Sequence, residues 1–107
     1  MGDTLQRICE LARAGTVKIS EHGYDELAAD GISAREIVEG LHDALLIEEY
    51  PSFVKGPCVL VRQRDKQGNA IHAVWGIPRN ELSPAVLITA YRPDPERWVD
   101  DFTRRTK

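Results

Sequence analysis

Two histidines stand at positions where an imidazole could carry out acid–base chemistry. His72 interrupts the apolar stretch AIHAVWGIP, residues 70–78, and His22 follows Ser20 in the segment ISEHGYDEL. Histidine can take up or release a proton near neutral pH because its ordinary pKa lies there. A pair of histidines can therefore act as general base and general acid, provided that both reach the same reacting atom.

His72 is predicted to lie on the less apolar face of a β-strand. Strand alternation places the more apolar neighbours on the other face: Ile71, Ala73 and Trp75. We expect His72 to point toward a less buried side or a cleft. Thr89 is expected opposite it on the next strand, to within two residues, with Tyr91 diagonally close. A half-exposed histidine that only hydrogen-bonds a neighbour fits the same pattern.

His22 is predicted to lie in the first turn of a helix that Ser20 caps. The partial positive charge at a helix N-terminus disfavours an imidazolium cation, so we expect a neutral imidazole there. A neutral imidazole suits a general base or a metal ligand. A buried histidine that only hydrogen-bonds the end of its own helix fits this position equally well.

Tyr91 and Arg92, in TAYRPDPERW, are predicted to lie where a strand ends and a helix begins. Arginine offers a planar set of donors that suits phosphate, and a helix N-terminus also attracts anions. Tyrosine can donate a proton or stack on a nucleic-acid base. Together these residues would suit a phosphodiester, although packing of Tyr91 against Trp98 explains them without any ligand.

Metal and cofactor sites have little support in this sequence. Glu48, in IEEYP, could join the two histidines, and two histidines with one carboxylate are enough to bind a metal ion. No two of these three residues are close in the chain, however, and the GxGxxG, P-loop, GxSxG and HExxH motifs are absent. We therefore predict no metal and no other cofactor.

The charge is divided unevenly along the 107 residues. Residues 1–52 hold four Lys/Arg and eleven Asp/Glu, which gives −7, while residues 53–107 hold ten and six, which gives +4 and recovers the net −3. Net charge therefore does not mark this protein as a nucleic-acid binder, but its basic half could present a local positive face. A mixed, solvated surface is the simpler interpretation.

Nothing in the sequence indicates a membrane protein or an exported protein. No apolar run approaches the ~20 residues of a membrane-spanning helix, and MGDTLQRICE lacks the features of a signal peptide. Cys9 and Cys58 are isolated, which is typical of small buried apolar residues in a reducing compartment. We expect a cytoplasmic protein without a membrane partner.

The elements that must position these residues form one predicted α+β domain, residues 1–107. Helices are expected over residues 4–14, from Ser20 to about Asp30 and from Ser33, and residues 17–19 suggest a short strand. Strands are expected over residues 44–51, 57–65, 70–77 and 85–91, with a last helix from Asp94 whose Trp98 and Phe102 face the sheet. This order predicts N-terminal helices and a C-terminal helix packed on an antiparallel sheet of about four strands.

Five motifs in this order resemble a known bacterial family. They are IS-x-H, GIS-x-x-E-I-x-x-x-L, IEEYP, IHAVWG and TAYRPDPERW, and together they run from about Ile19 to Trp98. The family is catalogued as domain of unknown function 4258 and is more distantly similar to toxin ribonucleases of the BrnT and RelE type. The resemblance implies helices on a curved antiparallel sheet. The positions that recur in the family fall here on His22, Gly31, Glu48, Tyr50, His72, Tyr91 and Pro93.

This chain departs from the family in one respect that bears on RNA. Family members commonly follow the first histidine with an arginine and a methionine on the same helix, whereas here Asp25 and Glu26 stand close behind His22. Carboxylates at these positions would repel a polyanion, and phosphate contacts supply most of the non-specific affinity for nucleic acid.

Two functions follow as hypotheses. The first is a toxin-related, metal-independent ribonuclease that acts on RNA and pairs with a cognate antitoxin: His22 or His72 is the base and the other the acid, Arg92 stabilises the charged phosphorane-like state, and Tyr91 positions a base. It requires both histidines and Tyr91 within about 8 Å around a concave, positive pocket. The alternative is a non-catalytic protein-binding module or antitoxin-like adaptor that uses an exposed sheet edge or the acidic helices.

Overall fold

Three helices form where the sequence supplies caps and a short apolar stripe. The computed structural model describes residues 3–106, and its helices are α1 (Asp3–Arg13), α2 (Glu21–Ala29) and α3 (Ala34–Glu39), with a 3-10 turn η1 at Gly40–Asp43. The hydroxyls of Ser20 and Ser33 accept backbone N–H hydrogen bonds at the starts of α2 and α3, and Glu36 completes a capping box. Gly31 follows α2 with a φ of +67°. The predicted helices before residue 40 are confirmed.

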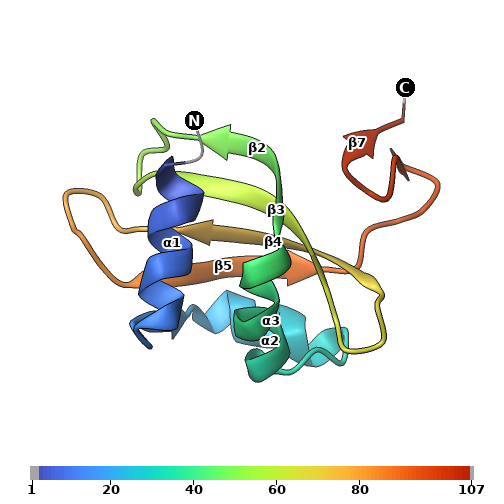
Figure 1. Cartoon of the computed structure of the whole chain (residues 1–107), viewed down its shortest axis with the longest axis horizontal. Helices are drawn as coiled ribbons and strands as arrows, with labels where there is room; N and C mark the ends of the chain where they lie inside the picture. The colour runs from blue at the N-terminus through green and yellow to red at the C-terminus, as the bar shows by residue number, and fades with distance from the viewer. Residues whose placement is uncertain (1–2, 107) are drawn as a thin grey trace.

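The sheet has five strands in place of the expected four. They are β1 (Val17–Ile19), β2 (Leu45–Tyr50), β3 (Cys58–Arg64), β4 (Ala70–Gly76) and β5 (Ala85–Tyr91). β2 to β5 form the predicted antiparallel meander, and β1 adds parallel to β5, so that the order across the sheet is β1-β5-β4-β3-β2 (Figure 1). The fold is α+β, as predicted, but its main sheet is mixed.

The hydrophobic core lies between the sheet and the helices α1 and α3. Ile8 and Ile37 pack there with Trp75, and all three are fully buried. The buried amide of Gln63 accepts a hydrogen bond from the Trp75 indole N–H at 2.8 Å and donates one to the Ile37 carbonyl at 2.7 Å. The polar atoms of this part of the core are therefore paired, which avoids the cost of burying them alone.

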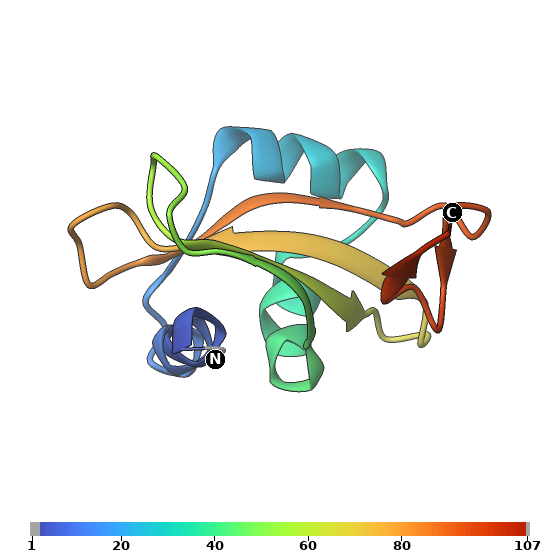
Figure 2. The ribbon, with the colours of Figure 1, turned by 90° about the horizontal axis from the view of Figure 1, so that it is seen from above.

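The helix α2 lies over β5, on the other side of the sheet from α1 and α3 (Figure 2). A side chain at Gly23 would bring its Cβ within 3.0 Å of the Leu87 carbonyl oxygen, so glycine allows the close approach. α2 therefore packs through Gly23 and Leu27. Tyr24, on the same helix, is 56 % exposed.

The predicted C-terminal helix is not formed. Residues 94–105 instead make turns and two short strands, β6 (Trp98–Val99) and β7 (Arg104–Arg105), which pair with each other. Asp100, Asp101 and Phe102 take positive φ values of 53°, 59° and 66°, which a right-handed helix does not allow. Trp98 and Phe102 are four residues apart, as two residues on one face of a helix would be, but this segment folds as a hairpin.

Within residues 3–106, none of the helices has the length and hydrophobicity that crossing a lipid bilayer requires.

Candidate functional site

The sheet face opposite α1 and α3, here called the outer face, carries a row of polar side chains. The register pairs Arg62 of β3 with His72 of β4, and His72 with Tyr91 of β5. Tyr91 thus lies directly opposite His72, two residues from the expected Thr89 and at the limit of the expected register, and Thr89 pairs with Val74. A bulge in β5 shifts the register beyond Val74, and sequence alternation alone does not predict a bulge.

His72 is fully buried in this row, so the prediction that it faces a cleft is wrong. Its Nε2 lies 2.7 Å from the Phe102 carbonyl oxygen, its Nδ1 lies 3.3 Å from the Tyr91 hydroxyl, and its ring meets the Trp98 ring edge-on at 4.4 Å. Burial lowers the pKa of His72, as do the nearby charges of Arg105 and Arg62, while the Phe102 hydrogen bond opposes them. A neutral imidazole fits these contacts: Nε2–H donates to Phe102 and Nδ1 accepts from Tyr91.

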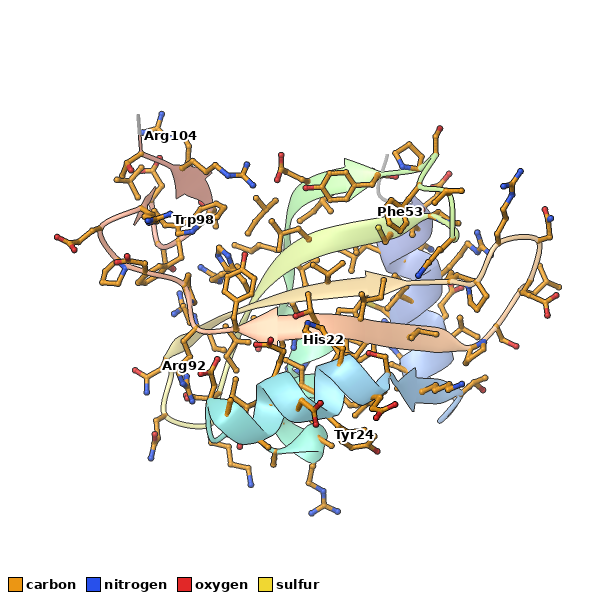
Figure 3. The ribbon with its side chains drawn as sticks, turned by 180° about the vertical axis from the view of Figure 1, so that it is seen from behind. His22, Tyr24, Phe53, Arg92, Trp98 and Arg104 are labelled. Atoms are coloured by element: carbon orange, nitrogen blue, oxygen red, sulfur yellow. The ribbon has the colours of Figure 1, made fainter. Side chains whose placement is uncertain are left out.

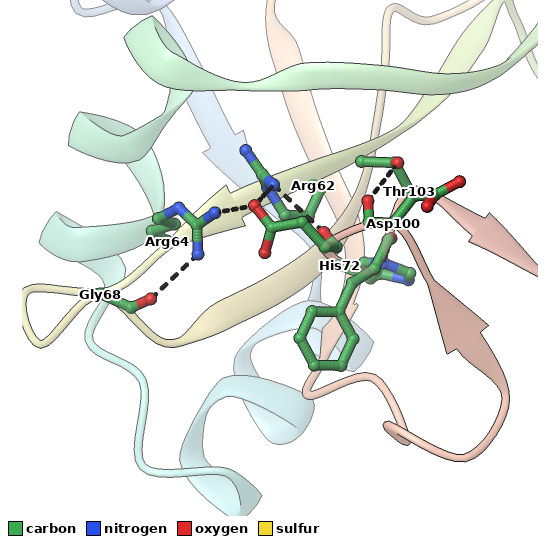
Figure 4. Close-up of polar contacts among 8 residues, drawn as sticks. Arg62, Arg64, Gly68, His72, Asp100 and Thr103 are labelled. Atoms are coloured by element: carbon green, nitrogen blue, oxygen red, sulfur yellow. Dashed lines mark hydrogen bonds and ion pairs between the residues drawn. The ribbon is translucent and has the colours of Figure 1, made fainter.

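The turn between β6 and β7 is what covers His72 (Figure 4). Asp101 in this turn forms ion pairs with two arginines of β3: its Oδ2 is 2.6 Å from Arg62 Nη1 and also pairs with Arg64. The Arg62 side chain is only 7 % exposed, so its charge depends on Asp101 for a partner. These ion pairs and the His72–Phe102 hydrogen bond fasten the C-terminal hairpin to the outer face.

A second group of polar contacts joins the hairpin to β2. Glu48 Oε1 accepts a hydrogen bond from the Tyr50 hydroxyl at 2.8 Å and lies 2.8 Å from Arg105 Nη2. Hydrogen bonds from Arg105 and Tyr50 lower the pKa of Glu48, so this carboxylate is ionised at neutral pH. The Arg105 guanidinium also lies over the Trp98 ring, 5.0 Å from its centre.

We call these residues together the outer-face cluster: Glu48, Tyr50, His72, Tyr91, Trp98 and Arg105. Burial raises the pKa of Tyr91, Arg105 lowers it and Glu48 raises it, so the two halves of the cluster influence each other electrostatically. The cluster combines an ionised carboxylate, a guanidinium, two phenols and an indole. These groups can accept a proton, bind phosphate and stack on bases.

A groove of about 780 Å³ opens beside the cluster. Its lining consists of Tyr91, Arg92, Asp94, Arg97, Trp98, Arg105 and Thr106. Each of its arginines already has a carboxylate partner: Arg92 pairs with Asp65 at 3.0 Å, Arg97 with Asp94 at 3.7 Å, and Arg105 with Glu48. The groove is therefore rich in guanidinium groups but balanced in charge, and a phosphate would have to compete with these carboxylates.

Two of the four predicted site residues, His72 and Tyr91, come together in the structure. Arg92 borders the groove, but its guanidinium pairs with Asp65 and its backbone N–H donates to Asp30 at 3.2 Å, which ties β5 to the end of α2. His22 is on α2, its side chain 66 % exposed and 3.5 Å from Glu26, and it lies apart from Trp98 (Figure 3). His22 is therefore outside the outer-face cluster.

Glu48 was expected as a candidate metal ligand, and the resemblance placed both Glu48 and Tyr50 among the recurrent family positions. Tyr50, Trp98 and Arg105 were not predicted as site residues. The spacing of Glu48 and Tyr50 carries a signal, because residues two apart on a strand share a face. The sequence around Arg105 gives no such signal, because only the folded hairpin brings Arg105 to β2. Within residues 3–106, no group of three or more His, Cys, Asp or Glu side chains is arranged to hold a metal ion.

Comparison with family models matches residues 19–92 to the family described as "Domain of unknown function (DUF4258)". A comparison with curated proteins found no match, and a comparison with solved structures found none either. The family match includes the last residue of β1 and all of β2 to β5, and therefore the outer-face residues that these strands supply. It ends before the hairpin begins. Because the match spans more than half of the chain, this protein belongs to the DUF4258 family.

Proposed function

We propose that the outer-face cluster binds single-stranded RNA and cleaves its backbone without a metal ion. The observation that carries this proposal is the ion pair of Glu48 and Arg105, whose arginine lines the groove together with Tyr91 and Trp98. The Glu48 and Arg105 side chains are 35 % and 59 % exposed, so a substrate can reach them. The resemblance to toxin ribonucleases of the BrnT and RelE type supports the same function.

In this proposal Glu48 takes the place that the sequence assigned to a histidine. Arg105 exchanges its carboxylate partner for a phosphate oxygen, and Trp98 and Tyr91 stack on the flanking bases. The freed Glu48 accepts the proton of the 2′-hydroxyl while the 2′-oxygen attacks phosphorus and the bond to the 5′-oxygen breaks. The Tyr91 hydroxyl turns from His72 Nδ1 and protonates the leaving oxygen, and the proton on Glu48 returns to Tyr91 through water. The products are a 2′,3′-cyclic phosphate and a 5′-hydroxyl.

His72 acts as a positioning residue in this scheme. Its neutral imidazole accepts the Tyr91 hydroxyl hydrogen bond and holds the ring at the edge of the groove. It reaches no solvent and therefore no substrate.

The test is cleavage of a fluorescent single-stranded RNA by the wild type and by Glu48→Gln, with EDTA present. Glutamine keeps the shape and an acceptor oxygen but cannot take the proton, so we expect cleavage to fall by about 100-fold or more. The control is Glu49→Gln, which removes the same charge from the next residue of β2. Equal cleavage by the wild type and Glu48→Gln, or loss of all cleavage in EDTA, would show that the proposed chemistry is wrong.

A non-catalytic protein-binding module is the second candidate, and one observation favours it. β2 is at the edge of the sheet, and its Leu45 and Leu46 are exposed. An edge strand with apolar side chains can pair with an extended segment of another protein. If the wild type neither binds nor cleaves RNA, the protein-binding module replaces the ribonuclease as the proposed function.

A further inference from the structure

The end of the sheet farthest from the hairpin is formed by two connections, residues 51–57 and 77–84, which lie together in Figure 2. The Arg79 N–H donates to the Lys55 carbonyl at 2.9 Å, and the Ile77 N–H donates to the Pro57 carbonyl at 3.1 Å. Gly56 has a φ of +133°, and a Cβ there would lie 2.1 Å from the Ile77 carbonyl oxygen. The two connections are therefore held together by their backbones, in a contact that only glycine permits.

This contact shapes an apolar groove of about 290 Å³. Its lining consists of Phe53, Lys55, Gly56, Gly76, Ile77, Pro78, Val86 and Ile88. Three large apolar side chains on the same two connections remain in solvent: Phe53 is 49 %, Val54 67 % and Leu82 84 % exposed. Single exposed apolar residues are ordinary, but a set of them around an apolar groove is typical of an interaction site.

The size of the groove favours one side chain of a partner protein over a free small molecule. Pockets for drug-sized ligands span about 300–1,000 Å³, and this groove lies just below that range. It is large enough for an aromatic or leucine side chain. Because the backbone contacts preform it, a partner would lose little free energy in ordering it.

Charge identifies the kind of partner. Lys55 lines the groove, and Arg79 follows the lining residue Pro78 and donates its backbone N–H to Lys55. Lys18 of β1 pairs in register with Val86, which also lines the groove. Among the ion pairs of residues 3–106, none involves Lys18, Lys55 or Arg79, whereas each arginine of the other groove has a carboxylate partner. Glu81 is the only acidic residue in the segments 51–57 and 77–88. The rim is therefore positive and free to pair with carboxylates.

We infer that this groove is a docking site for an acidic segment of another protein, which places one bulky apolar side chain between Phe53 and Ile88. Carboxylates on either side of that anchor pair with Lys55 and Arg79. Burying the anchor supplies affinity, and the charges select the partner. The site is independent of the proposed RNA chemistry, because it lies at the opposite end of the sheet from the hairpin.

The experiment measures binding of a short fluorescein-labelled peptide, glutamates and aspartates around a central tryptophan, by fluorescence anisotropy. We expect a dissociation constant of about 10 μM for the wild-type chain. Matched peptides replace the tryptophan by serine, or the acidic residues by lysine, and both should bind about tenfold more weakly or not at all.

The variant Lys55→Glu/Arg79→Glu should weaken binding of the acidic peptide by about tenfold or more. Phe53→Ala should weaken its binding to the same extent, although this variant leaves the net charge of the protein unchanged. The control Arg35→Glu/Lys66→Glu makes the same charge change on exposed residues elsewhere and should bind as the wild type does. Equal binding of acidic and basic peptides, or no effect of the groove variants, would overturn the inference. So would binding only to phosphatidylglycerol vesicles, since that result would assign the surface to a membrane.

Discussion

His72 illustrates how one residue pattern can describe two very different environments. The strand pattern around it predicts a face that is less apolar, and that part is right, because Arg62 and Tyr91 are its neighbours in the row. The pattern says nothing about what covers that face. Here the backbone of Phe102 and the ring of Trp98 do so, and they turn a candidate proton carrier into a buried, neutral hydrogen-bonding group.

We predict that His72 makes folding stability fall as the pH drops below about 6.5, its ordinary pKa. Burial lowers the pKa of His72 in the folded state, so the unfolded chain binds a proton that the folded chain does not. The contribution of neutral His72 to the free energy of unfolding is fully present above the pKa of His72 in the unfolded chain. It is lost on acidification below that pKa, by at most about 1.4 kcal/mol per pH unit.

Urea unfolding between pH 7.5 and 5.5, followed by tryptophan fluorescence, measures this slope. His72→Gln keeps a donor for the Phe102 carbonyl but does not titrate, so its slope should be flatter than that of the wild type. His22→Gln is the matched control, because it makes the same substitution at an exposed histidine on α2. Equal slopes in the wild type and His72→Gln would contradict the prediction.

The C-terminal hairpin is the element whose attachment decides what the outer face can do. Its own two strands are two residues long, so they provide little stability by themselves. Attachment depends instead on Asp101 with Arg62 and Arg64, on Glu48 with Arg105, and on the His72 hydrogen bond. The hairpin brings Trp98 and Arg105 to the cluster and at the same time buries His72.

We predict that Asp101→Asn loosens the hairpin without unfolding the sheet. It leaves the buried Arg62 charge without its carboxylate, which should cost about 1–3 kcal/mol of local stability, because Asp101 itself is half-exposed. Hydrogen exchange of the Thr106 amide, which donates to Arg97, should become about tenfold faster or more.

The control for this prediction is Asp100→Asn. Asp100 pairs with Arg104 at 2.8 Å, but both side chains are exposed, and such pairs contribute little. If the Thr106 amide proton exchanges at the same rate in Asp101→Asn and Asp100→Asn, the Asp101 ion pairs do not fasten the hairpin to the sheet.

At the scale of the whole molecule, the core and the hairpin are separate parts. The buried apolar cluster runs from Ile8 to Ala90, and it includes no residue of the hairpin. The family match ends at residue 92, close to the same point. The buried apolar cluster therefore belongs to the sheet, its helices and their connections, and the hairpin adds a cover on one face.

We predict that a chain ending at Pro93 still folds. Its hydrophobic core is intact, so far-UV circular dichroism and cooperative unfolding should be retained, with a melting temperature lowered by roughly 10 °C. It should also lose RNA cleavage, because Arg105 and Trp98 are removed. A truncated chain without a cooperative transition would show that the hairpin is part of the folding unit.

The sequence alone determined the three helices, the four-strand meander and the α+β class. The signals behind them are local. Ser33 and Glu36, three residues apart, form a capping box at the start of α3. Gly68 in the β3–β4 turn takes a positive φ, which glycine allows. Only the tertiary structure decided the rest. The hairpin in place of a helix, the burial of His72 and the pairing of Glu48 with Arg105 depend on contacts between distant segments, and no spacing within either segment encodes them.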